Sequence, residues 1–130
     1  KIISKKIKYP NHVICGFTKI RNFENPINKN IPKVVMNKNN ELVYISRALV
    51  PSSKKKSKIQ FNKQVCIYAY NKKELTKFSA MKKKSDLEKL EDIEILRFFD
   101  LDIKIKMVKL NSKTLAVDVK SDIKKVEKFL

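Results

Sequence analysis

The segment QVCIYAY, Gln64 to Tyr70, is the most strand-like part of the chain. It is uninterrupted and rich in β-branched and aromatic residues, which suit a pleated, half-buried surface. Outward from it, apolar runs of strand length alternate with segments of helical spacing. The resulting order predicts an α/β fold in which helices cover a sheet. We expect helices over 1–8, 72–78, 87–99 and 121–130, strands over 12–20, 64–70, 103–108 and 114–117, and a hairpin from 34–36 and 42–45.

The length of 130 residues predicts one domain that is large enough to bury a core. No apolar run approaches 18 residues and no signal peptide is visible, so we expect a cytoplasmic chain without a membrane span. The chain begins at Lys1, without a methionine and inside a predicted helix, which indicates that this is not the natural N-terminus.

The net charge of +18 is concentrated in residues 1–85, which hold 21 basic and 3 acidic residues, whereas residues 86–130 hold 10 of each. A basic surface can meet a polyanion, either a nucleic acid or a nucleoside triphosphate. Of the 31 basic residues 28 are lysine, which lacks the planar fork with which arginine reads phosphates and guanine edges. A basic nucleic-acid-binding module therefore stays an alternative, and the composition argues against it.

Several kinds of chemistry find no support in the sequence. Cys15 and Cys66 both sit in apolar runs, a pattern typical of buried, reduced core thiols. The single histidine argues against a zinc site. There is one glycine, Gly16, and no glycine-rich loop that would cradle a phosphate.

The predicted helix over 87–99 carries the chain's clearest set of charged groups. Glu88, Glu91, Glu94 and Arg97 follow one another at intervals of three, so neighbours would share one helix face. Such a ladder is typical of an exposed stripe of ion pairs. The leucines around it also allow a partly sheltered stripe, and both interpretations stay open.

Three further positions have a functional and a structural interpretation each. Arg47, at the end of a predicted strand, is either an anion-binding fork or a surface arginine. Gln64 and Tyr68 are four apart in a strand and therefore on one side of it, either at a ligand or in the core. Asp118 follows the apolar run 114–117, where it is either a ligand at the mouth of the sheet or a helix cap.

Four segments, in order, resemble the motifs of one family. They are KVVMNKNNELVYISRALVP, QVCIYAYNKKEL, LEKLEDIEILRFFDLDIKIKMVKL and AVDVKSDIKKVEK. The chain resembles the 3-deoxy-manno-octulosonate cytidylyltransferase (CMP-Kdo synthetase) family from about Ile31 to Leu130, and more loosely back to His12.

The resemblance implies a three-layer, nucleotide-diphospho-sugar-transferase-like mixed sheet. Residues 1–130 would be a single domain, the C-terminal portion of the enzyme, and the N-terminal CTP-binding half would be absent. The implied activity is transfer of CMP from CTP to 3-deoxy-manno-octulosonate (Kdo) or a related ulosonic acid in lipopolysaccharide synthesis, with release of pyrophosphate. It also implies Mg²⁺, a homodimer, and an isolated chain that is inactive.

Residue by residue, the resemblance implies that Asp118 binds catalytic Mg²⁺ and that Arg47 helps to hold substrate. Tyr68, Glu91 and Glu94 would contact the sugar. Gln64 stands where the family has histidine, so this group cannot titrate. Further departures are Ile95 in place of the family's glutamine and Val119 in place of its threonine. Because of such departures, a non-catalytic relative that only dimerises stays an alternative.

Overall fold

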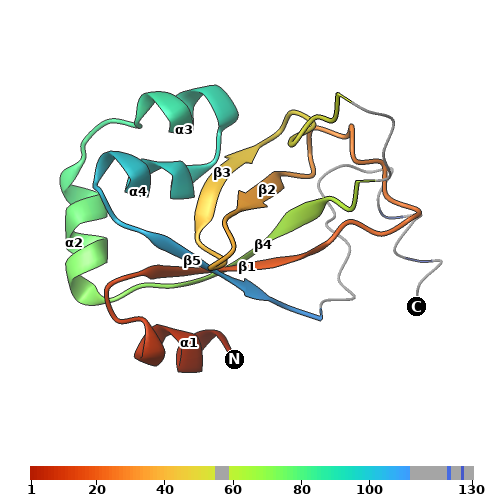
Figure 1. Ribbon diagram of the computed structural model, residues 1–130. Coiled ribbons are helices and arrows are strands. Elements are labelled where there is room, and N and C mark those ends of the chain that lie inside the picture. The colour runs from red at the N-terminus through yellow and green to blue at the C-terminus, as the bar shows by residue number, and fades with distance from the viewer. Residues whose placement is uncertain (55–58, 112–122, 124–126, 128–130) are drawn as a thin grey trace.

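The fold is built on a mixed five-stranded sheet with helices on its two faces, as the sequence predicts (Figure 1). The computed structural model describes residues 1–54, 59–111, 123 and 127. In chain order the elements are α1 (Ile2–Lys8), β1 (Val13–Lys19), β2 (Lys33–Met36), β3 (Leu42–Ser46), β4 (Asn62–Ala69), α2 (Lys72–Ala80), α3 (Asp86–Glu91), the 3₁₀ turn η1 (Glu94–Leu96), α4 (Arg97–Asp100) and β5 (Ile105–Lys109).

The strands lie in the order β3-β2-β4-β1-β5. β1 runs antiparallel to β4 and parallel to β5, while β2 and β3 form the predicted antiparallel hairpin. The hairpin turn is held by Asn37, whose side-chain oxygen accepts hydrogen bonds from the backbone N–H groups of Asn39 and Glu41. Asn40 completes the turn at a φ of 56°, a left-handed conformation in which asparagine is enriched.

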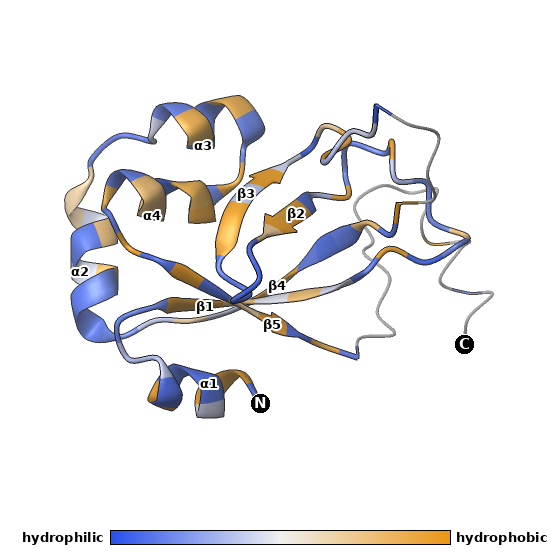
Figure 2. Cartoon of the chain, viewed as in Figure 1, coloured by the Kyte–Doolittle hydropathy of each residue, from blue (hydrophilic) through white to orange (hydrophobic). Residues whose placement is uncertain are grey.

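Both faces of the central strand β1 are covered. Val13, Cys15 and Phe17 point into the main core, which they share with η1 and α4. Ile14 lies between them in the strand, so it points to the opposite face, and it is also fully buried. The apolar residues gather along the strands and on the helices that face them (Figure 2). This arrangement has the three layers that the resemblance implies.

The predicted single helix over 87–99 is wrong, because the segment is broken in its middle. α3 ends at Glu91, and Asp92 takes a left-handed conformation at a φ of 51°. Helical structure resumes at Glu94. The four residues buried after the break recur too closely to lie in one stripe of a straight helix, so the chain turns to bury all of them: Ile93, Ile95, Leu96 and Phe98.

The two cysteines differ in exposure, so one of the two buried thiols predicted is wrong. Cys15 is fully buried, but Cys66 is exposed. Cys15 pairs with Tyr68 and the next residue, Gly16, pairs with Val65, so two extra residues bulge out of β4. Cys66 lies in this bulge, and its apolar neighbours in the sequence do not bury it.

The chain's single glycine stands where the backbones crowd. A Cβ atom on Gly16 would lie 2.6 Å from Leu110 Cδ1 and 3.2 Å from the carbonyl oxygen of Val65. A Cβ atom here would displace the end of the Leu110 side chain and bring the Val65 carbonyl a few tenths of an ångström too close. Glycine therefore relieves crowding at this position, and its backbone angle is an ordinary one.

Some predictions fall outside the described residues. These are the strand over 114–117, Asp118, and most of the helix over 121–130. Of the lysine-rich segment PSSKKKSK, residues 51–58, the structure describes only the part up to Lys54. Within the described ranges, no helix has the length and apolar character needed to cross a membrane.

Candidate functional site

A row of hydrogen-bonded polar side chains runs from the core face of β4 to the surface. Gln64 Nε2 lies 2.7 Å from Tyr68 Oη, which in turn lies 2.9 Å from Glu94 Oε1. The hydroxyl has one hydrogen, and an ionised carboxylate can only accept, so Tyr68 donates to Glu94 and accepts from Gln64. Because the bulge adds two residues, alternation is kept and the predicted placement of Gln64 and Tyr68 on one side is confirmed. Glu94 is exposed at the outer end.

The inner end of this row of side chains, Gln64, reaches the core. Gln64 Nε2 also lies 3.9 Å from Cys15 Sγ. Burial raises the pKa of the Cys15 thiol to about 12. Burial, together with the nearby Cys15 and Glu94, also raises the pKa of Tyr68. The Cys15 thiol and the Tyr68 hydroxyl therefore stay protonated at neutral pH. Gln64 continues to donate to Tyr68, and Tyr68 to Glu94.

The difference between the two cysteines gives a direct prediction. We expect a thiol reagent such as DTNB to modify Cys66 in the native chain and Cys15 only after denaturation, because the thiolate is the reacting form. Absorbance at the thionitrobenzoate band counts the thiols that react. A Cys66→Ser variant should lose the native reaction. Equal rates at both cysteines in the native protein would contradict the buried placement of Cys15.

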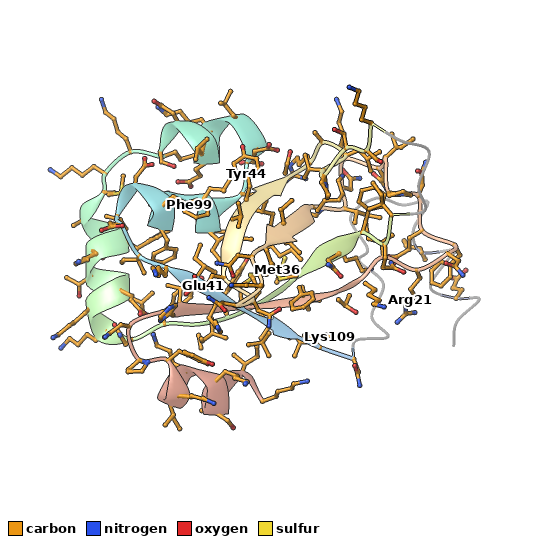
Figure 3. All side chains as sticks on the ribbon, viewed as in Figure 1. Arg21, Met36, Glu41, Tyr44, Phe99 and Lys109 are labelled. Atoms are coloured by element: carbon orange, nitrogen blue, oxygen red, sulfur yellow. The ribbon has the colours of Figure 1, made fainter. Side chains whose placement is uncertain are left out.

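The carboxylate of Glu91 is held by groups at the end of β3. Its Oε1 accepts from Ser46 Oγ at 2.6 Å and from Tyr44 Oη at 3.3 Å, and its Oε2 accepts from the N–H of Arg47 at 2.8 Å. Figure 3 shows Tyr44 on the side of β3 that faces α3 and α4. Burial raises the pKa of Glu91, but these hydrogen bonds outweigh it and leave the pKa lowered.

Arg47 binds backbone carbonyls in the described structure. Its Nε donates to the carbonyl oxygen of Glu91 at 2.6 Å, and its two terminal nitrogens donate to those of Lys29, at 3.0 Å, and Asp92, at 3.1 Å. The left-handed turn at Asp92 presents two of these three carbonyls. The break in the predicted helix thus builds part of the surroundings of Arg47.

The other end of the predicted charge ladder forms a buried ion pair. Arg97 Nε and Nη2 each lie 2.6 Å from an oxygen of Glu88, nine residues earlier. The guanidinium also lies over the ring of Phe78, 4.0 Å from its centroid. Since Glu88 is 2% exposed, the interpretation of the ladder as an exposed stripe is wrong for this pair. The break in the helix at Asp92 separates the charged residues of the ladder into three groups with different partners.

The structure therefore brings five of the six predicted site residues into two clusters. Gln64, Tyr68 and Glu94 form the first, and Arg47 and Glu91 the second. The sixth, Asp118, lies outside the described residues.

The second cluster contains one residue that the sequence interpretation missed. Lys33, the first residue of β2, is fully buried and donates to the carbonyl oxygen of Arg47. No sequence signal marks this lysine, because its hydrogen bonds go to backbone carbonyls.

The described residues contain no group of three or more histidine, cysteine, aspartate or glutamate side chains that could hold a metal ion. The predicted Mg²⁺ ligand, Asp118, is not among them.

Comparison with known proteins adds to this geometry. No protein-family model matches the chain. It is similar to the 3-deoxy-manno-octulosonate cytidylyltransferase of Parabacteroides distasonis, 35% identical over 109 residues that cover 79% of this chain and 43% of that protein. The corresponding protein of Fusobacterium nucleatum is 30% identical over 112 residues, covering 86% of this chain and 45% of that protein.

A solved structure extends the comparison to nearly the whole chain. The structure described as CMP:2-keto-3-deoxy-manno-octonic acid synthetase complexed with CTP matches with a TM-score of 0.84 and 26% identity. The match covers 98% of this chain and 53% of that one. The chain thus spans about half the length of the curated relatives and of the solved structure that it matches.

Together, the mixed sheet and this match define the class, an α/β fold of the nucleotide-sugar-transferase type, of which the chain makes up a part. The resemblance to the 3-deoxy-manno-octulosonate cytidylyltransferase family, predicted from four motifs, is confirmed over about half the length of its members.

Proposed function

We propose that this chain is the sugar-binding portion of a cytidylyltransferase. The whole enzyme would transfer CMP from CTP to 3-deoxy-manno-octulosonate or a related ulosonic acid in lipopolysaccharide synthesis. The observation that carries the proposal is the match to a CTP-complexed synthetase over 98% of this chain. The exposed end of the Gln64–Tyr68–Glu94 chain supports it, because a carboxylate there can accept hydrogen bonds from sugar hydroxyls.

In the proposed reaction a sugar hydroxyl oxygen attacks the α-phosphorus of CTP. The new oxygen–phosphorus bond forms as the bond from the α-phosphorus to the pyrophosphate oxygen breaks, and the hydroxyl proton is released. Glu94 accepts from a hydroxyl of the sugar, and Tyr68 fixes the direction in which the carboxylate points. Gln64 holds Tyr68 and cannot titrate, so this part of the site keeps one protonation state.

We also propose that Asp118 contributes one ligand to Mg²⁺, as the family resemblance implies. Bound magnesium would neutralise charge on the phosphates. One carboxylate does not fill the octahedral shell of Mg²⁺, so the other ligands would come from substrate phosphates, water and residues outside this chain. The resemblance supports a homodimer as the assembled form.

A chimera tests the proposal. The matched residues of the Parabacteroides distasonis relative are replaced by this chain, and pyrophosphate release is measured with CTP, Mg²⁺ and Kdo. We expect release that depends on all three. Glu94→Gln should raise the KM for the sugar about tenfold or more, because a hydrogen bond to a charged group is lost, and should leave the KM for CTP nearly unchanged.

The matched control is Asp86→Asn, which removes another carboxylate of the same region, one that is 93% exposed and forms a surface ion pair with Lys89. It should leave both KM values unchanged. A folded chimera that releases no pyrophosphate with any 3-deoxy-ulosonic acid would sink the proposal and favour a non-catalytic relative. Salt-dependent retention of the chain on DNA, without turnover by the chimera, would favour the nucleic-acid alternative instead.

A further inference from the structure

Lys33 is one of the largest side chains that are fully buried in the described structure. Lysine is almost never fully buried unless its ammonium has partners, because removing the charge from water is costly. Lys33 opens β2 and pairs with Ser46, the last residue of β3 and the one before Arg47. Its burial therefore calls for a specific explanation.

The partners of Lys33 are backbone carbonyls and one nearby carboxylate. The ammonium donates to the carbonyl oxygens of Arg47, at 2.5 Å, and of Asn28, at 3.1 Å. Burial lowers the pKa of Lys33, and the negative charge of Glu91 acts against that shift. The ammonium is thus stabilised by the negative charge of Glu91, while its hydrogen bonds are made to backbone carbonyl oxygens.

Glu91 binds the backbone N–H of Arg47, the residue whose carbonyl accepts from Lys33. The N–H of Arg47 donates to Glu91 Oε2 at 2.8 Å, while the carbonyl of Arg47 accepts from Lys33. The backbone of Arg47 is therefore held between an ammonium at its carbonyl and a carboxylate at its N–H. Hydrogen bonds to charged groups are stronger than neutral ones, so this pair holds the backbone firmly. We call Lys33 and Glu91 the Arg47 clamp.

Within the described residues, the hydrogen bonds of the Arg47 guanidinium leave part of its donor capacity unused. It donates to three carbonyl oxygens, and a guanidinium has five N–H groups. Among the ion pairs found within the described ranges, none involves Arg47. An oriented guanidinium of this kind suits an anionic group, a carboxylate or a phosphate.

We propose that Lys33 and Glu91 are positioning residues, which fix the backbone of Arg47 so that its guanidinium is oriented toward an anionic group of the substrate. The identity of that substrate rests on the proposed function. The clamp itself rests only on the described contacts. It assigns Glu91 to holding Arg47, and leaves Glu94 as the carboxylate that contacts the sugar.

Arginine side-chain NMR tests the clamp without an assay of enzymatic activity. The chain has three arginines, so its ¹⁵Nε–H spectrum holds three signals. We expect the Nε–H of Arg47 to exchange slowly with water in the native chain. Lys33→Met and Glu91→Gln should each speed that exchange about tenfold or more, because a charge-assisted hydrogen bond is lost. The Arg97 signal, fixed by Glu88, is the internal reference.

Lys63→Met is the matched control. Lys63 is the partner of Lys33 across the β2–β4 pair, and its ammonium pairs with Glu24 instead, with 12% of its side chain exposed. It should leave the Arg47 signal unchanged. Should Lys33→Met fail to fold, Glu91→Gln still decides. Unchanged Arg47 exchange in Glu91→Gln, or equal acceleration in Lys63→Met, would overturn the clamp.

A second arm identifies the anionic group in the chimera. If Arg47 faces the sugar acid, Glu91→Gln raises the KM for Kdo about tenfold and leaves the KM for CTP unchanged; if it faces a phosphate, the reverse holds. Either shift supports the positioning role, and equal KM values in variant and parent overturn it. If no chimera turns over but the NMR result holds, the proposed function has failed and the clamp stands.

Discussion

Replacing Glu88 by glutamine is expected to lower the free energy of unfolding by about 3 kcal/mol, because it leaves a sheltered arginine without its counter-charge. Both oxygens of Glu88 bind Arg97 at 2.6 Å, and the Arg97 side chain is 14% exposed. Glutamine offers one acceptor oxygen, and its amide N–H groups face the N–H groups of the guanidinium. Urea denaturation of the parent and the variant measures the difference.

The control lies on the same helix. Asp86 forms an ion pair with Lys89, but the side chains of these residues are 93% and 56% exposed. Asp86→Asn should therefore cost less than about 0.5 kcal/mol. Equal losses in the two variants would mean that the burial of the Glu88–Arg97 pair has no energetic consequence.

The same pair predicts how stability depends on pH. The hydrogen bond to Arg97 holds the pKa of Glu88 below its ordinary value. A carboxylate with a lowered pKa in the folded state contributes stability that is fully present above the unfolded-state pKa, about 4.3, and is lost as pH falls through the folded-state value. The difference between the parent and Glu88→Gln should thus be constant above about pH 6 and shrink progressively below about pH 4.

The parts of the fold that could be predicted depend on local chemistry. The hairpin follows from Asn37 and Asn40, whose side chains and backbone suit a tight turn. The neighbourhood of Gln64 and Tyr68 follows from the two-residue period of a strand. The bulge in β4 did not disturb this relation, because it inserts an even number of residues.

What could not be predicted depends on contacts distant in sequence. The helical spacing of residues 87–99 does not show where the helix ends, because the break at Asp92 depends on burying four residues in one core: Ile93, Ile95, Leu96 and Phe98. The partner of Arg97 is nine residues away instead of three, because the turn brings Glu88 back to it.

The burial of Lys33 could not be predicted either, because its partners are backbone carbonyls. A carbonyl is present at every position, so the sequence holds no pattern for such a contact.

The largest loss of stability is expected from Phe98→Ala, about 4 kcal/mol in the free energy of unfolding. Phe98 is 1% exposed in α4, with its ring centroid 5.6 Å from that of Tyr70 and 5.1 Å from that of Phe78. Truncation would remove the ring from the centre of this aromatic stack and leave a cavity there. Urea denaturation followed by circular dichroism measures the loss.

Phe99, the next residue, is a matched control, because it is an equally large ring that is only partly buried at the edge of the core (Figure 3). Phe99→Ala should cost about 1 kcal/mol. The Phe98 ring also supports Tyr70, which stacks on Tyr68 at 5.8 Å. Its loss should therefore raise the KM for the sugar in the chimera, while Phe99→Ala should not. Equal destabilisation by the two changes would place the centre of the core elsewhere than between α4 and β4.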